Sequence, residues 1–281
     1  MGRFSRQEIL NRLNQKRMMK KPIIIGAAGI GLIAKVADKA GIDIIMSYCT
    51  GPVRLNGNPG KIGYMGYTDS NGVTLEMGNK MISQAKNTPF VGGIGVADPY
   101  RDQDRLIDEM LEVGFSGVTN VPTVGGHAGA LRQIMEDYGV GFNGEVALIE
   151  KCRKRDIFTI AYAFNEEQTR AIVAAGADII CPHVGTTADK SIQYKAVPTV
   201  EDAAVKINRM YEVAIKENPD VIVSCHGGPF IDPKSVQKGF DLTQVDAFVG
   251  ASTVERIPLE AAIFDAVTAF THLRLNDKTE D

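Results

Sequence analysis

The sequence contains no tryptophan, and its 281 residues include only four cysteines and four histidines. The cysteines stand far apart and form no CxxC pair, so the spacing typical of a disulfide framework or a zinc site is missing. They are Cys49, Cys152, Cys181 and Cys225, and most of them lie in apolar segments. We therefore expect four reduced thiols in the protein core.

An excess of basic residues is also missing. Lysine and arginine total 31 against 34 aspartates and glutamates, which gives a formal net charge of -3. Proteins that collect nucleic acid or anionic lipid do so through a basic surface, and this balance provides none. We predict that neither nucleic acid nor a membrane is a partner, and that the chain acts on a small anionic substrate or effector.

Long apolar runs are absent as well. No segment approaches the roughly 18 apolar residues that a membrane span requires. Residues 1–21 carry scattered charge and lack the apolar region of a secretory signal. Together these absences favour a cytoplasmic protein.

The sequence does contain a regular alternation of strand-like and helix-like segments. Eight short apolar runs, rich in Val, Ile and Ala and bounded by Gly and Pro, are typical of parallel strands buried on both faces. These runs are residues 22–27, 42–48, 89–95, 117–122, 157–163, 178–183, 220–226 and 246–250. The expected helices between them are residues 33–40, 76–85, 105–113, 130–137, 144–155, 166–175, 200–217 and 258–270.

Eight such units in about 250 residues match the size of a (β/α)₈ barrel. Gly41, Gly114 and Gly176 follow helical segments and suit the left-handed position that ends a helix. A basic amphipathic stretch, Arg6–Lys16, predicts one further helix that closes the barrel bottom or packs on a neighbouring subunit. We predict an α/β fold, a (β/α)₈ TIM barrel over residues 22–281 with an N-terminal helical extension over residues 1–21, in a homo-oligomer.

An open, doubly wound sheet is the competing architecture, because Gly26, Gly29 and Gly31 resemble a dinucleotide-binding fingerprint. After Gly26 the sequence reads AAGIG, which does not give G-x-G-x-x-G, and no acidic residue ends the second strand. We therefore expect no nucleotide cofactor. The longest irregular stretch runs from Cys49 to Gly72, and its length and glycines predict a mobile lid over the active face.

The active face of such a barrel is built from the strand carboxyl ends and the loops that follow them. His183 ends the sixth expected strand and His226 the seventh, so both can serve as acid–base groups, although either one alone also suits a buried structural histidine. Asn120 and His127 follow the fourth strand, where His127 can donate to a substrate oxygen.

Acidic candidates follow the third and fourth strands. Asp98 and Asp102 flank Pro99, and we interpret Asp98 as a metal ligand or base and Asp102 as a helix cap. Glu145 either lies at the mouth or faces solvent.

The loops after the seventh and eighth strands commonly form the phosphate site of this fold, because glycine lets backbone N–H groups approach an anion. The segments SCHGGP and GASTVERIP occupy these positions. They assign Gly227, Gly228, Gly250, Ala251 and Ser252 to a phosphate or carboxylate site, although the glycines also suit plain tight turns. Arg256 either adds a charge-assisted contact there or pairs with Glu255 or Glu260.

Several longer phrases resemble the phosphoenolpyruvate hydrolase-like family of TIM-barrel proteins, which is also found as the C-terminal half of the Tm-1-like proteins. The phrases are GAAGIGLIAKVADKAGID, GIGVADPYRD, NVPTVG, CHGGP and GASTVERIPLE, and the resemblance extends from about residue 22 to residue 270. The family is more distantly similar to the phosphoenolpyruvate mutase and isocitrate lyase superfamily, which binds α-keto acids and phosphonopyruvate through Mg²⁺. This chain departs from the superfamily in having Asp98 alone where paired acidic metal ligands stand.

The resemblance implies a phosphoenolpyruvate hydrolase or phosphonomutase-like enzyme acting on a small phosphorylated or α-keto acid. On this hypothesis a divalent cation such as Mg²⁺ near Asp98 polarises the substrate oxygen, and His183 or His226 moves the proton. The alternative hypothesis is a non-catalytic module that binds an effector in the same pocket and serves ligand sensing or assembly.

Overall fold

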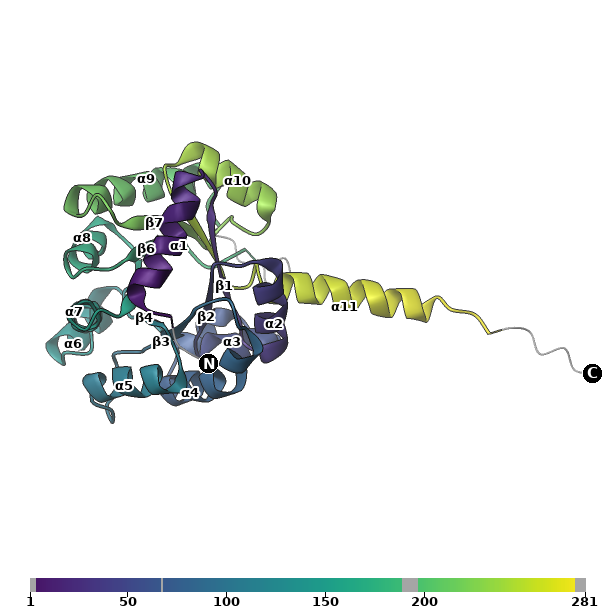
Figure 1. Cartoon of the computed structure of the whole chain (residues 1–281), viewed down its shortest axis with the longest axis horizontal. Helices are drawn as coiled ribbons and strands as arrows, with labels where there is room; N and C mark the ends of the chain where they lie inside the picture. The colour runs from purple at the N-terminus through teal and green to yellow at the C-terminus, as the bar shows by residue number, and fades with distance from the viewer. Residues whose placement is uncertain (1–3, 67, 189–196, 276–281) are drawn as a thin grey trace, which may run out of the picture.

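The computed structural model describes residues 4–66, 68–188 and 197–275. Its eight strands are all parallel and close into a barrel in chain order, with β8 paired to β1 (Figure 1). The strands are β1 Ile23–Ala27, β2 Ile44–Ser47, β3 Phe90–Gly93, β4 Gly117–Thr119, β5 Phe158–Ala163, β6 Ile179–Pro182, β7 Ile222–His226 and β8 Ala247–Gly250. Each lies within one of the eight predicted runs, so the predicted barrel is confirmed.

Helices follow the strands and surround most of the barrel. They are α2 Gly31–Ala40, α3 Thr50–Leu55, α4 Ser70–Met81, α5 Gln103–Val113, α6 Gly129–Asp137, α7 Phe142–Lys154, α8 Glu166–Ala174, α9 Val200–Glu217, α10 Pro233–Leu242 and α11 Arg256–Thr271, with short 3₁₀ helices η1 Gly60–Tyr64 and η2 Ile82–Gln84. The predicted helix-ending glycines have positive φ angles of 83° at Gly41, 112° at Gly114 and 97° at Gly176. The left-handed turn is therefore confirmed at each of them.

Three elements, α3, η1 and α10, were not expected from the sequence. Helix α10 begins with Asp232 as N-cap and Pro233 in its first turn, and Gly239 in its interior lowers its helix propensity. The segment Cys49–Gly72 was expected to be irregular, but outside Tyr67, which is not among the described residues, it contains α3, η1 and the start of α4.

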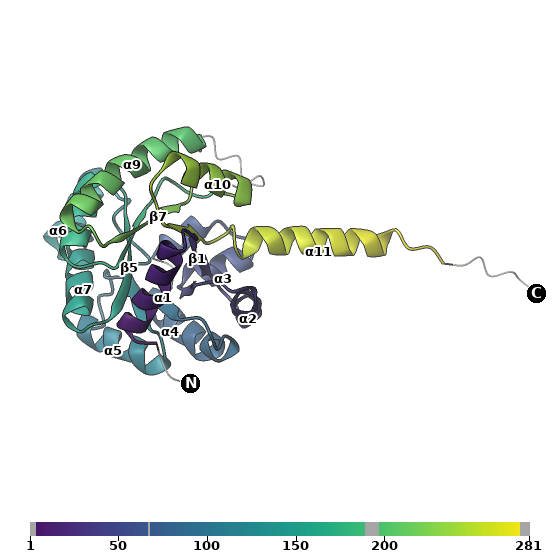
Figure 2. The ribbon, with the colours of Figure 1, turned by 45° about the horizontal axis from the view of Figure 1, so that its top comes forward.

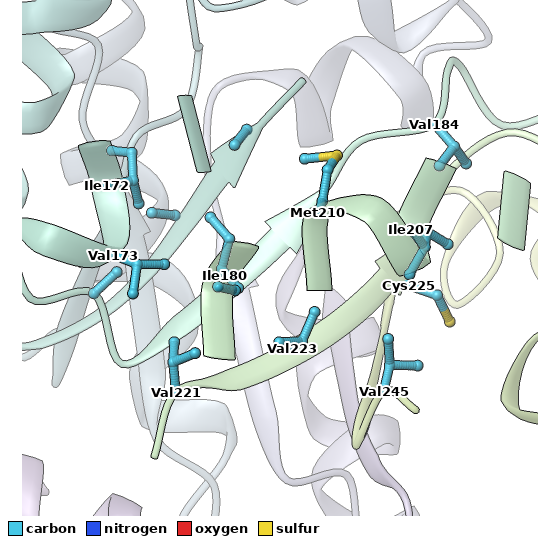
Figure 3. Packing of buried hydrophobic residues seen from close by; sticks show 14 of the residues in the cluster. Ile172, Val173, Ile180, Val184, Ile207, Met210, Val221, Val223, Cys225 and Val245 are labelled. Atoms are coloured by element: carbon cyan, nitrogen blue, oxygen red, sulfur yellow. The ribbon is translucent and has the colours of Figure 1, made fainter. Parts of the chain in front are cut away.

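The apolar core has layers inside and outside the barrel. Side chains that point inward, among them Ile25, Met46 and Val249, form one fully buried cluster. Side chains that point outward meet the helices, as Figure 3 shows for Ile180 and Val223 beneath α8 and α9. The four cysteines are buried and free, which confirms the predicted core thiols.

The N-terminal helix α1, Arg6–Met18, closes the barrel at the amino ends of the strands (Figure 2). Its apolar Ile9 and Leu13 belong to the cluster inside the barrel. Its basic residues pair with aspartates that precede three strands: Arg6 with Asp178 at 2.6 Å, Lys16 with Asp43 at 2.7 Å and Arg17 with Asp246 at 3.0 Å. Of the two predicted positions for this helix, the structure shows the barrel bottom.

Helix α11 departs from the ring. It follows β8, but in both views it points away from the barrel into open space (Figures 1 and 2). Among the described residues, no helix is long and apolar enough to cross a membrane.

Candidate functional site

A pocket opens at the carboxyl ends of the strands, where the active face was predicted. Its lining comes from the segments after β2, β6 and β8 and from the ends of β5 and β7. The lining residues are Tyr48, Thr50, Arg54, Gly60, Lys61, Tyr64, Tyr162, His183, Gly185, Thr186, Thr187, His226, Ala251 and Ser252. Five of them belong to the segment Cys49–Gly72, so this segment lies over the mouth, while its mobility stays a prediction.

Two histidines form the floor of this pocket. His183 directly follows β6 and is bridged to His226 at the end of β7, and their ring centroids are 4.9 Å apart at an interplanar angle of 79°. The His183 ring stacks on Phe164, with centroids 4.8 Å apart, and the His226 ring packs edge-on against Tyr162 at 5.1 Å. The prediction that both histidines point into the mouth therefore agrees with their position.

The hydrogen bonds of the two rings assign opposite tautomers. His183 Nδ1 accepts the backbone N–H of Gly185 at 3.1 Å, so in the neutral ring the proton is on Nε2. His226 Nδ1 lies 2.8 Å from the carbonyl oxygen of Val249, which can only accept, so the proton is on Nδ1 and Nε2 carries a lone pair. The pair thus offers one N–H donor and one nitrogen base.

Burial keeps both rings neutral. Desolvation lowers the pKa of His226 to about 4, although the hydrogen bond to Val249 opposes this shift. Desolvation also holds the pKa of His183 well below its usual value, and the neighbouring His226 acts in the same direction. At neutral pH the floor of the pocket therefore presents uncharged imidazoles.

The lining contains two basic side chains. Arg54 on α3 and Lys61 on η1 both line the pocket, and none of the described lining residues is acidic. The Arg54 guanidinium is buried and donates through Nε to Glu255 Oε1 at 2.5 Å, with further contacts to Glu255 and to Thr50 Oγ1. Burial raises the pKa of Glu255, and the guanidinium of Arg54 opposes this shift. This pair ties the segment after β2 to the loop after β8.

Hydroxyl groups complete the polar lining. Thr50, Thr186, Thr187 and Ser252 each bring an O–H that can donate to or accept from a ligand. Two cations, four aliphatic hydroxyls and an imidazole N–H form a donor set that suits a small ligand with carboxylate or phosphate oxygens.

The predicted anion loops are present, but they contribute to the pocket only in part. Ala251 and Ser252 line it, whereas Gly227 and Gly228 do not. The Gly228 N–H donates to the Gly185 carbonyl oxygen at 3.0 Å, and Gly227 and Gly228 have φ angles of 79° and 54°. These glycines therefore join the loops after β7 and β6, and in this arrangement the Gly228 N–H is not available to a phosphate.

The remaining predicted phosphate-binding residues also lie outside the pocket lining. A Cβ on Gly250 would lie 2.6 Å from Val254 Cγ2, so glycine permits close packing there. Arg256 Nη1 contacts Glu260 Oε1 at 2.7 Å, which is one of the pairings predicted for it.

The residues predicted after β4 are also elsewhere. Asn120 is fully buried and clamps β4 to β5, because its amide accepts from Tyr162 N and donates to Tyr162 O. His127 is half-buried beside α6 and does not line the pocket.

The two aspartates of the third loop have structural contacts. Asp98 Oδ1 accepts the backbone N–H groups of Tyr100 and Arg101, and its Oδ2 accepts from Asn71 at 2.9 Å and from Arg101 at 2.8 Å. The catalytic and metal-binding roles predicted for Asp98 therefore have no counterpart in the lining of this pocket. Asp102 caps α5 as predicted, accepting from Arg105 N at 3.0 Å.

For Glu145 the sequence left two positions open, at the mouth or facing solvent, and the structure shows neither, because its carboxyl group is buried. It is fully buried on α7 and accepts from Asn120, from Thr123 Oγ1 at 2.8 Å and from Val124 N at 2.6 Å. Burial raises its pKa to about 8, against the effect of these hydrogen bonds. Its role is to hold the loop after β4.

The described residues do not form a ready site for Mg²⁺. This ion prefers oxygen ligands in octahedral geometry, usually including a carboxylate. No described lining residue is acidic, and no group of three or more described His, Cys, Asp or Glu residues is placed to hold a metal. The nearby Glu255 is already paired with Arg54.

Comparisons with known proteins agree on the family and on the barrel. The model of the phosphoenolpyruvate hydrolase-like family matches residues 8–273. The ToMV susceptible protein tm-1 of Solanum lycopersicum is 35% identical over 268 residues, which are 95% of this chain and 36% of that protein. The chain thus spans about a third of the length of this relative.

Solved structures similar to this chain include a phosphonopyruvate hydrolase in complex with oxalate and Mg²⁺, with a TM-score of 0.61, 15% identity, and coverage of 98% of this chain and 90% of that chain. Another is 2,3-dimethylmalate lyase, a member of the phosphoenolpyruvate mutase and isocitrate lyase superfamily, with a TM-score of 0.57, 17% identity, and coverage of 97% and 91%. At these identities the likeness shows the fold. Because the family model spans nearly the whole sequence, the chain belongs to the phosphoenolpyruvate hydrolase-like family.

Proposed function

We propose that this chain is an enzyme that binds a small phosphorylated or α-keto acid in the pocket and cleaves it. The observation that carries the proposal is the pair of neutral histidines with opposite tautomers, His183 and His226, in a pocket that Arg54 and Lys61 also line. An N–H donor and a nitrogen base side by side can stabilise a developing negative charge and accept a proton in one reaction. Lys61 supplies affinity for an anionic substrate, and Arg54, which is paired with Glu255, adds N–H groups to the same lining.

The reaction class that fits this arrangement is hydrolysis of a C–P or C–C bond next to a keto group. Water oxygen bonds to the departing phosphonyl or acyl group, and His226 Nε2 accepts the proton that water loses. The electron pair of the broken bond remains on the other product as an enolate, whose oxygen accepts from His183 Nε2–H. A proton then returns to the enolate carbon. Phosphonopyruvate, the substrate named for a similar structure, is a small acid of this kind.

The support for a divalent cation is the similar phosphonopyruvate hydrolase, whose structure was solved with Mg²⁺. The pocket lining does not supply the carboxylates that this ion prefers, so no step is assigned to a metal here. Assays with and without Mg²⁺ therefore belong in the test.

The test is turnover by the full chain with phosphonopyruvate, oxaloacetate and phosphoenolpyruvate, followed by ³¹P and ¹H NMR. His226→Gln removes the base and is expected to lower kcat about a hundredfold or more. Lys61→Met is expected to raise KM about tenfold, which corresponds to one lost charge-assisted contact. Lys151→Met, which changes a lysine that pairs with Asp104 on the outer helices, is the control and should alter neither value.

Saturable thermal stabilisation by these acids without any product would favour the alternative, an effector-binding module that senses or assembles. Absence of both binding and product would place the ligand of this chain in another chemical class.

A further inference from the structure

The carboxyl end of β3 has no room for a metal ligand. Gly93 ends this strand, and a Cβ there would lie 2.5 Å from Tyr48 Cβ and 2.5 Å from the Val121 carbonyl oxygen. Both distances are shorter than real Cβ contacts, so an aspartate at this position would displace the backbone after β4. Tyr48 and Val121 belong to the buried cluster inside the barrel. The strand after which a metal was predicted therefore meets packed protein at its carboxyl end.

Three carboxyl groups in segments at this end of the barrel already have protein partners. They are Glu255, which accepts from Arg54, Glu145, which accepts from Asn120, Thr123 and Val124, and Asp98, which accepts from Asn71 and Arg101. A metal ion that recruited one of them would leave its donors unpaired, and a buried unpaired donor costs free energy. These carboxyl groups are therefore poorly placed to serve a cation in the pocket.

Lys61 is the basic side chain that the lining leaves for a ligand. None of the described carboxylates forms an ion pair with its ammonium, whereas Arg54, the other cation, is paired with Glu255. After burial and His226, the charge of Lys61 is a further cause of the lowered pKa of His183, so its field reaches the pocket floor. Among the described lining residues, Lys61 thus carries the positive charge that a bound anion can use.

We infer that the pocket binds its acid without a divalent cation, and that the ammonium of Lys61 neutralises the carboxylate or phosphonate of the ligand. The class of ligand rests on the proposed function, and the new element is the group that stands against its negative charge. The similar phosphonopyruvate hydrolase was solved with oxalate and Mg²⁺. This chain holds the same kind of acid with a side chain of its own. A lysine ammonium has one charge and three N–H donors, and a chelator cannot remove it.

The first test measures binding of oxalate to the full chain by isothermal titration calorimetry, once in EDTA and once in Mg²⁺. Oxalate carries two carboxylates but no keto group, so it reports binding without turnover. The Kd is expressed per free oxalate, because Mg²⁺ also binds oxalate in solution. The two buffers should then give values within about threefold of each other.

The second test assigns the counter-charge to Lys61. In EDTA, Lys61→Met should raise the Kd for oxalate about tenfold, the loss of one charge-assisted contact, while Lys61→Arg should stay within about threefold of the parent. Lys151→Met removes a lysine outside the pocket and should leave the Kd unchanged. Because Lys61 is exposed, added salt should weaken binding to the parent more than binding to Lys61→Met.

The third measurement looks for the metal itself. The full chain is dialysed against Mn²⁺ with and without oxalate, and the Mn²⁺ retained on the protein is determined by atomic absorption. Oxalate should not increase the amount retained. Binding of oxalate that requires Mg²⁺, extra Mn²⁺ retained with oxalate, or a Kd in EDTA that Lys61→Met leaves unchanged would each overturn the inference. So would the absence of oxalate binding in both buffers.

These outcomes are distinct from failure of the proposed enzyme. Metal-free binding of oxalate that depends on Lys61, together with no turnover of phosphonopyruvate, oxaloacetate or phosphoenolpyruvate, would refute the enzyme and support the metal-free anion site. Turnover and oxalate binding that both require Mg²⁺ would support the enzyme and refute the metal-free site.

Discussion

Substitution of Gly227 by alanine examines how tightly the loops beside the pocket pack. Gly227 has a φ of 79°, and a Cβ there would lie 2.2 Å from the Gly185 carbonyl oxygen, well inside any real contact. An L-residue at this φ costs about 1–2 kcal/mol, and overpacking costs about 1–3 kcal/mol more. We therefore expect Gly227→Ala to lower the free energy of unfolding by about 2–5 kcal/mol.

The chain offers a matched control in Gly57. It has the same φ of 79°, but a Cβ there would meet nothing within 4 Å. Gly57→Ala should therefore cost only the backbone contribution of about 1–2 kcal/mol. Urea unfolding followed by far-UV circular dichroism, at one protein concentration, gives both values. Equal losses for the two variants would refute the reasoning, because the contact with Gly185 would then contribute nothing.

Two further predictions concern buried charge. Arg54→Met leaves the buried Glu255 carboxylate without its partner and should lower the free energy of unfolding by about 3–5 kcal/mol. The same change in a Glu255→Gln background should lower it by clearly less. Equal losses in a double-mutant cycle, measured by urea unfolding, would show that the pair is not coupled. The pKa of His226 is about 6.5 in the unfolded chain but about 4 in the folded protein. Its contribution to the free energy of unfolding is therefore complete above pH 6.5 and is lost as the pH falls toward 4, by about 3 kcal/mol in all. NMR titration of the His226 ring should give a midpoint well below 6.5, and His226→Gln should flatten the acid side of the stability profile.

The barrel was predictable because each strand carries its own local signal. Runs such as residues 157–163 are apolar at nearly every position, since both faces of a barrel strand are covered. Gly41 and Gly114 mark helix ends by backbone conformation alone. Helix α10 was missed because it is short and Gly239 in its interior lowers its intrinsic helix propensity. Its better signal was the capping pattern of Asp232 and Ser235 around Pro233.

The site was predicted less completely, because its residues are far apart in the sequence and come together only when the barrel closes. His183 and His226 were identifiable from their positions at strand ends. Arg54 and Lys61 lie inside a long segment with no regular pattern, and the partner of Arg54, Glu255, is 201 residues away. The glycines of the CHGGP phrase were assigned to an anion, but a glycine needed for a ligand and one needed for contact between two loops look the same in a sequence.

The position of α1 has a consequence for the order in which the molecule is completed. This helix precedes every strand in the sequence, yet its partner Asp178 comes 172 residues after Arg6, and Asp246 comes later still. Until β8 has joined the sheet there is no closed ring for Ile9 and Leu13 to cover, so α1 can complete its contacts only late in folding. Before the ring closes, the chain therefore exposes these two apolar side chains and an open sheet edge, the kind of surface that chaperones protect.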